Sequence, residues 1–327
     1  MESPQEGCQG LRPSYHTVTQ SIVVARLPGM VSPTPLVVGS FSPSVLLRVA
    51  RRSGALADRG LEVREEPVPS SPAQFAALAD GSLDAALTSP DNVVAYRFLP
   101  GNPLGGTRDV RIVSAIDRGL GLALYARPEV VSVDQLRGAT VGVDVAASGF
   151  AFALFEILAR AGVGRDDVEL VELGSTPKRL QALLDDRCTA TMLNAGNDLR
   201  ADEAGLVRLV DVTSVATPYL GTVLAVQGQP APAVRRLADA LRIATAAVLS
   251  GEARDLALEE AEATGLPPHL AARYVERLAD PDRGLVPDGV TDPASLESVV
   301  ALRRAHTTDP LEAATSPDSG LVAAPAA

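Results

Sequence analysis

Small polar side chains gather in four short segments, each of which follows an apolar stretch. The segments run from Ser40 to Ser44, from Thr88 to Asn92, from Ala146 to Phe150 and from Asn194 to Asp198. Backbone N–H groups at the start of a helix bind carboxylate, sulfonate or phosphate groups, amide side chains both donate and accept hydrogen bonds, and carboxylates attract amines. These segments therefore predict a binding site for a small polar solute.

The candidate ligand contacts come from these four segments and from one later loop. They are Ser40, Phe41, Ser42, Ser44, Thr88, Ser89, Asp91, Asn92, Ser148, Gly149, Phe150, Asn194, Asn197, Asp198 and Tyr219. Asn194 and Asn197 are the strongest, because two Asn flanking Ala-Gly at a strand end is an unusual use of polar residues. Three other candidates could instead have a structural role: Ser42 and Ser148 could be helix N-caps, and Asp91 could cap the helix that follows it.

An internal duplication explains why the segments come in pairs. Residues 39–92 and 144–197 read as two versions of one segment at a constant offset of 105 positions. Each copy runs from a turn into an apolar helix, then to a Ser-Pro or Thr-Pro helix start, an Ala-Leu pair, and an apolar strand before the polar loop. Two α/β units of this kind predict two similar lobes whose strand-end loops face one another across a cleft.

The order of predicted elements gives the domain boundaries. We expect an α/β protein with a discontinuous first lobe, a continuous second lobe, and hinges near residues 118–128 and 216–226. The first lobe is predicted to comprise residues 35–127 and 223–306, and the second residues 128–222. Residues 1–34 and 307–327 lack periodicity and are predicted to be a disordered leader and tail.

Several residues near the predicted cleft have weaker claims. Phe41 and Phe150 hold nearly equivalent positions in the two copies and could sandwich a planar ligand, although a place in the core explains them as well. Arg118 lies at the outgoing crossover and could clamp an anion. Lys178 and Arg179 are interpreted as the solvated first turn of a helix.

Composition excludes several classes of function. Lys plus Arg number 29 and Asp plus Glu number 40, so the formal net charge is −11, which disfavours nucleic acid or an anionic membrane as a partner. Aromatic content is 3% with no Trp, which excludes a sugar cleft built on stacked indoles. The two cysteines, Cys8 and Cys188, supply neither a disulfide framework nor a metal site.

The cellular location stays undefined at this point. The sequence shows neither a recognisable export signal nor an apolar run of about 18 residues for a membrane helix. The protein is cytoplasmic as the sequence is written, and extracytoplasmic if a leader is missing from it.

Three motifs carry a family resemblance. They are a Gly-Leu-Glu-Val strand entry within 55–63, an Ala-Leu and Leu-Asp-Ala-Ala pair within 77–86, and Ser-Val-Asp-Gln-Leu-Arg-Gly-Ala-Thr-Val-Gly-Val within 131–143. In this order, and with the duplication, the chain resembles the type 2 periplasmic-binding-protein fold. The branch is that of substrate-binding proteins for aliphatic sulfonates, nitrate-like solutes and pyrimidine thiamine precursors.

This resemblance implies a specific function. Two lobes would close on a sulfonate, carboxylate or pyrimidine-like solute, as in the substrate-binding component of an ABC-type uptake system. An ABC permease is then a candidate partner besides the small-molecule ligand, and we expect a monomer.

Two alternatives stay open, an enzyme and a cytosolic ligand sensor on the same fold. An enzyme resembling a decarboxylase or dehydratase for a small organic acid would use Asp91, Asp117 or Asp198 as acid or base. The three histidines, His16, His269 and His306, fall outside the predicted cleft, which weighs against catalysis. It also weighs against a likeness to the pyrimidine synthase of this fold, which depends on a histidine and a cysteine-rich segment. Since neither a metal-ligand spacing nor a nucleotide-type Gly-rich loop occurs, we predict no metal and no cofactor.

Overall fold

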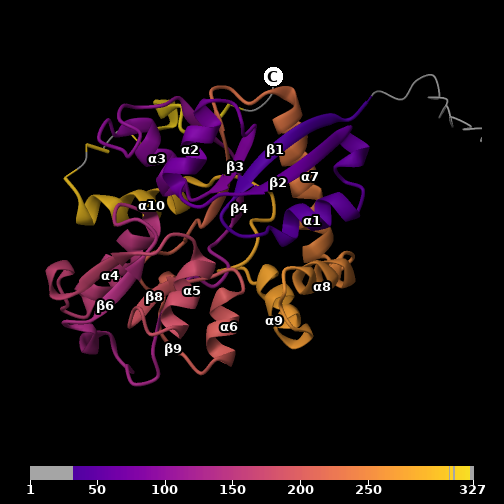
Figure 1. Cartoon of the computed structure of the whole chain (residues 1–327). Coiled ribbons are helices and arrows are strands. Elements are labelled where there is room, and N and C mark those ends of the chain that lie inside the picture. The colour runs from indigo at the N-terminus through magenta and orange to yellow at the C-terminus, as the bar shows by residue number, and fades with distance from the viewer. Residues whose placement is uncertain (1–31, 309, 312–313, 325–327) are drawn as a thin grey trace, which may run out of the picture. The chain divides into compact units, whose positions relative to one another are not determined.

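Two five-stranded sheets, each covered by helices, build the folded part of the chain (Figure 1). The computed structural model describes residues 32–308, 310–311 and 314–324. Within it, the chain from Pro33 onward is one compact unit. The prediction of an α/β fold with two lobes is confirmed. The predicted leader, residues 1–34, lies outside the described residues except for its last three, of which Thr34 begins the first strand.

The sheet of the first lobe has the strand order β2-β1-β3-β10-β4. Its strands are β1 (Thr34–Ser40), β2 (Leu61–Pro67), β3 (Ala85–Thr88), β4 (Val110–Asp117) and β10 (Thr222–Gln227). The helices around it are α1 (Val45–Arg52), α2 (Ser71–Ala79), α3 (Pro90–Phe98) and α7 (Pro232–Leu249). β1 pairs in parallel with β2 and β3, whereas β10 runs antiparallel to β3 and β4.

The sheet of the second lobe repeats this plan in the order β7-β6-β8-β5-β9. Its strands are β5 (Ala123–Ala126), β6 (Thr140–Val143), β7 (Glu169–Glu172), β8 (Ala190–Leu193) and β9 (Val207–Asp211). Its helices are α4 (Gly149–Arg160), α5 (Thr176–Leu184) and α6 (Asn197–Glu203). Short 3-10 turns lie between elements: η1 (Ala57–Arg59), η2 (Val133–Leu136), η3 (Arg165–Asp167), η4 (Val212–Ser214) and η5 (Pro317–Ser319).

The duplication seen in the sequence is a duplication of structure. Helix α5 lies 105 positions after α2 at both ends, and β8 lies 105 positions after β3 at both ends. In each sheet the fourth strand arrives from the other lobe and pairs antiparallel with both neighbours. The C-terminal ends of equivalent strands therefore face one another between the lobes.

The chain crosses between the lobes twice, and the first crossover comes earlier than predicted. The prediction placed residues up to 127 in the first lobe, but β5 pairs with β8 and β9 of the second sheet. An apolar run of this kind fits either sheet, so the sequence could not assign it. The two crossovers touch at two glycines, where a Cβ on Gly221 would overlap the backbone of Gly119.

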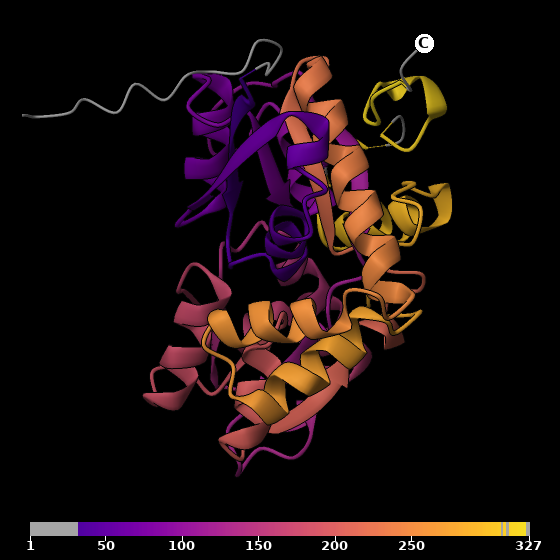
Figure 2. The same cartoon turned by 90° about the vertical axis from the view of Figure 1, so that its right-hand side faces the viewer.

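Three C-terminal helices lie across both lobes. They are α8 (Arg254–Ala263), α9 (Pro268–Leu278) and α10 (Pro293–His306). Figure 2 shows α8 and α9 below the long helix α7, against the lower lobe. There α9 packs on α6 through a row of ion pairs. The pairs are Arg277–Asp198, Arg273–Asp202 and His269–Glu203.

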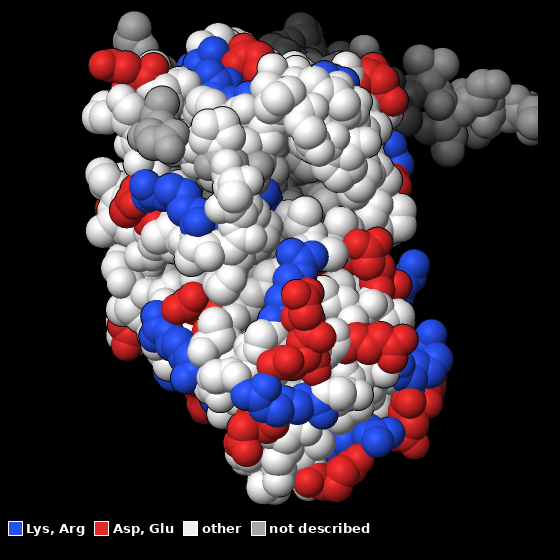
Figure 3. Space-filling view, turned by 90° about the vertical axis from the view of Figure 1, so that its left-hand side faces the viewer, with Lys and Arg blue, Asp and Glu red and all other residues white. Residues whose placement is uncertain are grey.

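Ion pairs also characterise the surface. On the face shown in Figure 3, acidic and basic side chains are interspersed over the lower lobe without a large area of one sign. Arg137–Asp167 and Arg160–Glu156 are two examples in the second lobe. Exposed pairs of this kind contribute little to stability, on the order of 0–1 kcal/mol each.

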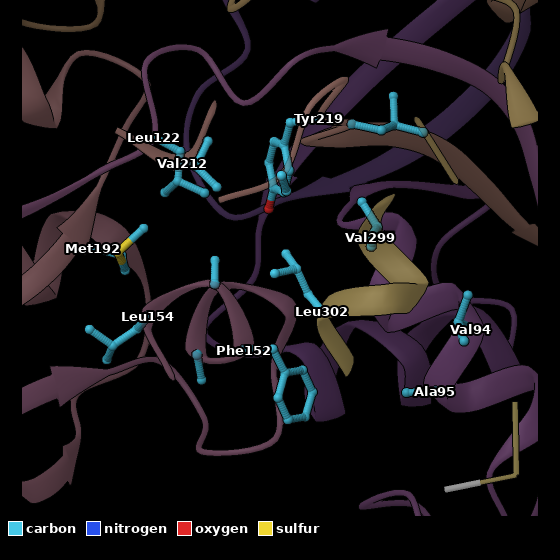
Figure 4. Close-up of a cluster of buried hydrophobic side chains, with 14 of the residues drawn as sticks. Val94, Ala95, Leu122, Phe152, Leu154, Met192, Val212, Tyr219, Val299 and Leu302 are labelled. Carbon is cyan, nitrogen blue, oxygen red and sulfur yellow. The ribbon is translucent and has the colours of Figure 1, made fainter. Parts of the chain in front are cut away.

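Helix α10 joins the two lobes through the core. It packs on α4 of the second lobe and on α3 of the first. Val299 and Leu302 belong to a buried cluster that also includes Val94, Phe152 and Met192, hence residues of both lobes (Figure 4). Because one continuous apolar cluster runs through both lobes, their separation would expose part of it to water.

A buried ion pair fixes α10 in this position. The guanidinium of Arg303 binds Asp91 of α3 through two hydrogen bonds of 2.8 Å and also donates to the carbonyl of Ala147, which precedes α4. Both charged side chains are almost fully buried, with Arg303 3% and Asp91 1% exposed. One side chain therefore ties the C-terminal helix to both lobes.

The described part of the C-terminal segment packs on the first lobe. Disorder was predicted from residue 307 onward, but Leu321 is buried, and its carbonyl accepts a hydrogen bond from Ile112 of the edge strand β4. Val322 forms a parallel bridge with Ile112. The prediction failed because single apolar anchors at Leu311 and Leu321 produce no periodic pattern.

We expect Asp91→Asn to lower the free energy of unfolding by about 3–5 kcal/mol, because it leaves the buried Arg303 charge without its carboxylate. Asp255→Asn is the matched control, since Asp255 holds the same second position in α8 but is exposed. Urea unfolding at neutral pH measures both. A loss below about 1 kcal/mol in Asp91→Asn would show that the pair does not hold α10 in place.

Candidate functional site

A cavity lies between the lobes, at the loops that follow β1, β3, β6 and β8. Its walls come from both lobes and from α9. The space open to water-sized groups is about 130 Å³, which is room for on the order of ten water molecules. Ligands of open α/β sheets bind in this place, beyond the C-terminal ends of the strands.

Five helices start at the wall of this cavity: α1, α2 and α3 from the first lobe, and α4 and α5 from the second. The positive ends of their dipoles therefore converge on one space. In four of these helices a serine side chain caps the first turn; the serines are Ser44, Ser70, Ser89 and Ser148. In α5, Ser175 makes no such bond. The start of α5 is thus the least satisfied of the five.

Internal carboxylates already serve two of the capped helices. Glu65 accepts hydrogen bonds from the Ser40 hydroxyl at 2.7 Å and from the Ser44 N–H at 2.8 Å, beside the start of α1. Asp144 accepts a short hydrogen bond from the Ser148 hydroxyl, beside the start of α4. A ligand anion is therefore not needed at either helix.

Most of the predicted ligand contacts line the cavity. They are Ser40, Phe41, Ser42, Ser44, Thr88, Ser89, Asn92, Ser148, Gly149, Phe150 and Asn194. Asn194 also has a structural role, because its amide donates to the carbonyl of Gly119 at 3.1 Å and its oxygen accepts from the Thr176 hydroxyl at 3.4 Å. It thereby joins the first crossover to the start of α5.

Two predicted acidic contacts lie in ion pairs away from the cavity wall. Asp91 turns toward α10 and Arg303, as described above. Asp198 pairs with Arg277 of α9 and accepts from the Gly196 N–H, and burial raises the pKa of its carboxyl although Arg277 opposes the shift. Both partners lie far away in the sequence, so local patterns could not reveal them.

The other two predicted contacts that miss the cavity are Asn197 and Tyr219. Asn197 donates its amide to the carbonyl of Asn194 and so stabilises the loop itself. Tyr219 is a core residue: 2% of it is exposed, and its ring packs on Gly119 at the crossover (Figure 4). Burial raises the pKa of the Tyr219 hydroxyl.

Arg118, the predicted anion clamp, lies on a different surface. It donates to the Ser295 hydroxyl of α10 at 3.3 Å and borders a separate cavity near the second crossover. Neither His269 nor His306 lines the cavity between the lobes; they pair with Glu203 and Glu156. His16 lies outside the described residues.

The residue that sequence reasoning missed is Arg179. It was interpreted as part of a solvated turn, but it lines the cavity with only 2% of its surface exposed. Its guanidinium donates to the carbonyls of Gly174 and Met192 and to the Thr176 hydroxyl. A signal was present, since Thr176, Arg179, Leu180 and Leu183 share one helical face and are all buried.

Arg179 carries its charge without a nearby counter-ion. No described carboxylate lies within ion-pair distance of its guanidinium, although Asp144 acts on it from further away. Burial lowers the pKa of Arg179, and Asp144 opposes the shift only in part. The guanidinium carbon also lies 5.9 Å from the centre of the Phe150 ring. The cavity wall therefore holds a buried positive charge.

Asp117, one of the three predicted acid–base residues, also lines the cavity. Burial raises the pKa of its carboxyl to about 6, against the opposing effect of hydrogen bonds from Thr222 and the Gly119 N–H. The Gly119 bond is 2.8 Å long. Asp117 thus connects the crossover to the cavity and changes its charge near neutral pH.

There is little support for metal-binding clusters, reactive thiols or membrane-spanning helices in the described part of the chain. There, His, Cys, Asp and Glu side chains form no group that could hold a metal ion. Cys188 is a buried, unpaired thiol whose pKa is raised by burial. None of the helices described is long and apolar enough to span a bilayer.

The pKa of Asp117 predicts a pH dependence of stability. Because the folded protein holds this proton more tightly than the unfolded chain, the stabilisation is complete below about pH 4 and is lost as the pH rises through about 6. A shift from 3.8 to about 6 corresponds to at most about 3 kcal/mol. The stability of the wild-type protein to urea should therefore decline between about pH 4 and 6, and we expect Asp117→Asn to remove this part of the decline. The exposed Asp58→Asn serves as control; equal pH dependence in wild type and Asp117→Asn would refute the assignment.

Comparison with known proteins supports the fold. No protein-family model and no curated protein sequence matches the chain. The nitrate-binding protein NrtA of Synechocystis PCC 6803 aligns with a TM-score of 0.71 over 89% of this chain and 86% of its own, at 10% identity. The alkanesulfonate-binding protein SsuA of Xanthomonas axonopodis pv. citri, bound to MOPS, aligns with a TM-score of 0.67 over 90% of this chain and 98% of its own, at 18% identity.

A third solved structure is a mutant of DSZB in complex with biphenyl-2-sulfinic acid. It aligns with a TM-score of 0.58 over 85% of this chain and 92% of its own, at 17% identity. The predicted resemblance is thereby confirmed at the level of fold: this chain has the periplasmic-binding-protein-like fold and resembles the sulfonate- and nitrate-binding proteins in structure.

Proposed function

We propose that this protein binds a small organic anion between its two lobes, as the substrate-binding component of an ABC-type uptake system. One observation carries the proposal: the buried guanidinium of Arg179 lines the cavity without an ion-pair partner among the described residues. A buried charge that is not paired is costly, and a bound anion would compensate it.

The start of α5 supplies the other half of the anion site. Ser175 and Thr176 line the cavity beside Arg179, and the positive end of the α5 dipole points into it. A carboxylate or sulfonate there would accept hydrogen bonds from the guanidinium and from hydroxyl groups. Planar donors of this kind suit both anions, so the charge alone does not choose between them.

Apolar residues of the same cavity fit the organic part of such a ligand. Phe41 and Phe150 line the cavity, from the first and second lobe. Leu46, Leu87 and Ile116 add aliphatic surface from the first lobe. A flat or aliphatic group of a few atoms would be removed from water there, and a pyrimidine-like ring is compatible with the two phenylalanines.

The structural neighbours agree with a negatively charged ligand, since one is a nitrate-binding protein and the other an alkanesulfonate-binding protein. At identities of 10% and 18%, the likeness extends to the fold, and the nature of the ligand here rests on Arg179. A permease partner follows from the proposed uptake role.

We expect Arg179→Gln to weaken the binding of butanesulfonate, measured by isothermal titration calorimetry, by about 1.5–3 kcal/mol, because a charged hydrogen bond is lost. Arg187→Gln, an exposed position in the same lobe, should bind as wild type does. Arg179→Lys keeps the charge and should lie between the two. A folded Arg179→Gln protein with wild-type affinity would contradict the proposed anion site.

Ligand binding by lobe closure makes a second prediction, which concerns Gly149. At this residue of α4, an added Cβ would lie 2.7 Å from the Cβ of Asp91 and 3.1 Å from the Ser89 hydroxyl, both in the other lobe. We expect Gly149→Ala to keep the lobes apart, to weaken butanesulfonate binding and to abolish the ligand-induced decrease in radius of gyration. Small-angle scattering measures the decrease.

The control for this experiment is Gly164→Ala, an exposed position where an added Cβ would lie 3.3 Å from the tip of the Asp167 side chain, which belongs to the same lobe. It should retain both the affinity and the compaction. If the wild-type radius of gyration does not change at saturating ligand, the lobes do not close on it.

A second candidate function is an acid–base enzyme, and the position of Asp117 favours it. Of the three predicted acid–base residues, Asp117 lines the cavity, whereas Asp91 and Asp198 are in buried ion pairs. A carboxyl with a pKa of about 6 could exchange a proton with a bound organic acid. Mass analysis of ligands recovered after incubation separates the functions, because an enzyme returns an altered compound and Asp117→Asn would then return it intact.

A further inference from the structure

A second cavity adjoins the first and is not explained by anion binding. It has a volume of about 350 Å³ and lies between α3, α4 and α10. Four residues border both cavities: Ser71, Asn92, Val145 and Ser148. All four side chains are short, so the partition between the two cavities is thin.

Part of the wall of the second cavity is apolar. Ala95, Leu99 and Phe152 line it, and Figure 4 shows Ala95 on α3 and Phe152 on α4 beside α10. The charged side chain at its inner end, Arg303, already binds Asp91 and the Ala147 carbonyl. The cavity therefore suits an uncharged, apolar group rather than a second anion.

Asn102, another buried polar residue of the wall, makes hydrogen bonds within its own loop. Its amide donates to the carbonyls of Leu99 and Gly106, and its oxygen accepts from the Leu104 N–H. It stabilises the loop that closes one side of the cavity. Arg165 lies exposed on the rim, where its guanidinium carbon is 4.5 Å from the centre of the Phe155 ring.

One buried polar group of this wall lacks a partner. The hydroxyl of Tyr96 meets the geometric criteria for a hydrogen bond with none of the described residues. Only 1% of Tyr96 is exposed, and the centres of its ring and the Phe75 ring are 4.0 Å apart. The hydroxyl is oriented toward Ser71, at the partition between the cavities. Even with the Ser71 side chain beside it, the Tyr96 hydroxyl retains hydrogen-bonding capacity for a polar group in the cavity.

We propose that the second cavity is a subsite for the tail of the ligand whose anionic group binds at Arg179. This inference rests on the proposed function and specifies the substrate class. The ligand is an organic acid with an elongated, mainly apolar tail that passes Ser71 and Ser148, and it is not an inorganic oxyanion. A hydroxyl, carbonyl or ether oxygen in the tail would pair with the Tyr96 hydroxyl.

Size supports the same conclusion. The first cavity offers about 130 Å³ and the second about 350 Å³. The second cavity therefore offers additional room beside the first, and a chain that passes the partition would occupy it. Apolar groups that enter it are removed from water, which raises affinity by about fourfold per methylene at full burial.

Calorimetric titration of the full chain with methanesulfonate, butanesulfonate and octanesulfonate tests the subsite. In wild type we expect the affinity to rise along the series by at least about twofold per methylene. In Ala95→Leu, which fills the second cavity, methanesulfonate should bind as in wild type and octanesulfonate at least about tenfold more weakly. The control is Ala301→Leu on the exposed face of α10, which should leave the whole series unchanged.

A second variant also fills the cavity, so the subsite can be tested even if Ala95→Leu does not fold. Gly101 borders the second cavity, and a Cβ there meets no atom within 4 Å. Gly101→Leu should therefore fold and should also weaken octanesulfonate selectively. Tyr96→Phe should remove any preference for a tail that contains a hydroxyl group over the matching alkyl tail.

The outcomes separate this inference from the proposed function. Wild-type affinity that does not depend on chain length, or a chain-length effect that persists in Ala95→Leu and Gly101→Leu, overturns the tail subsite and leaves the anion site intact. Absence of binding for all three sulfonates and for the matching carboxylates overturns both. A rise that both variants abolish establishes the subsite.

Discussion

The contact between the two crossover segments is the constraint on which the rest of the structure depends. At Gly119 and Gly221 the backbones approach so closely that a side chain on Gly221 would overlap Gly119. This contact brings three cavity elements together: Asp117 accepts from the Gly119 N–H, Asn194 donates to the Gly119 carbonyl, and Gly221 donates its N–H to the carbonyl of Asp117. The geometry of the ligand site and the relative position of the sheets are therefore set at one point.

Charge is distributed unevenly among the helix starts at the cavity. Glu65 and Asp144 provide negative charge at α1 and α4, whereas α5 has the uncompensated guanidinium of Arg179 and no side-chain cap. Outside the cavity the buried charges are paired: Asp91 binds Arg303, and Asp198 binds Arg277. Helix α10 joins the lobes through the buried cluster, and the α8–α9 pair connects α1 of the first lobe to α6 of the second, so that any closure has to keep these contacts.

Much of this could be predicted from the sequence, because the fold is expressed in repeated local patterns. The offset of 105 positions and the polar loops after apolar strands predicted the two lobes and eleven of the residues that line the cavity. Arg179 was missed because a charged residue in a first helical turn is usually solvated, although it shares a face with Leu180 and Leu183. Asp91 and Tyr219 were misplaced because what surrounds them, Arg303 and the packed crossovers, depends on tertiary structure that no local pattern encodes.

The most direct test of the central claim, that the cleft holds an anionic solute and releases it unchanged, is a thermal-shift comparison of isosteres. Methanesulfonate and butanesulfonate should raise the melting temperature by several degrees, methanesulfonamide and butanesulfonamide should not, and each sulfonate should be recovered intact by mass analysis. Equal stabilisation by the neutral sulfonamides would contradict an anion site at Arg179. An altered compound would contradict a binding protein and identify the cleft, with Asp117 in its wall, as catalytic.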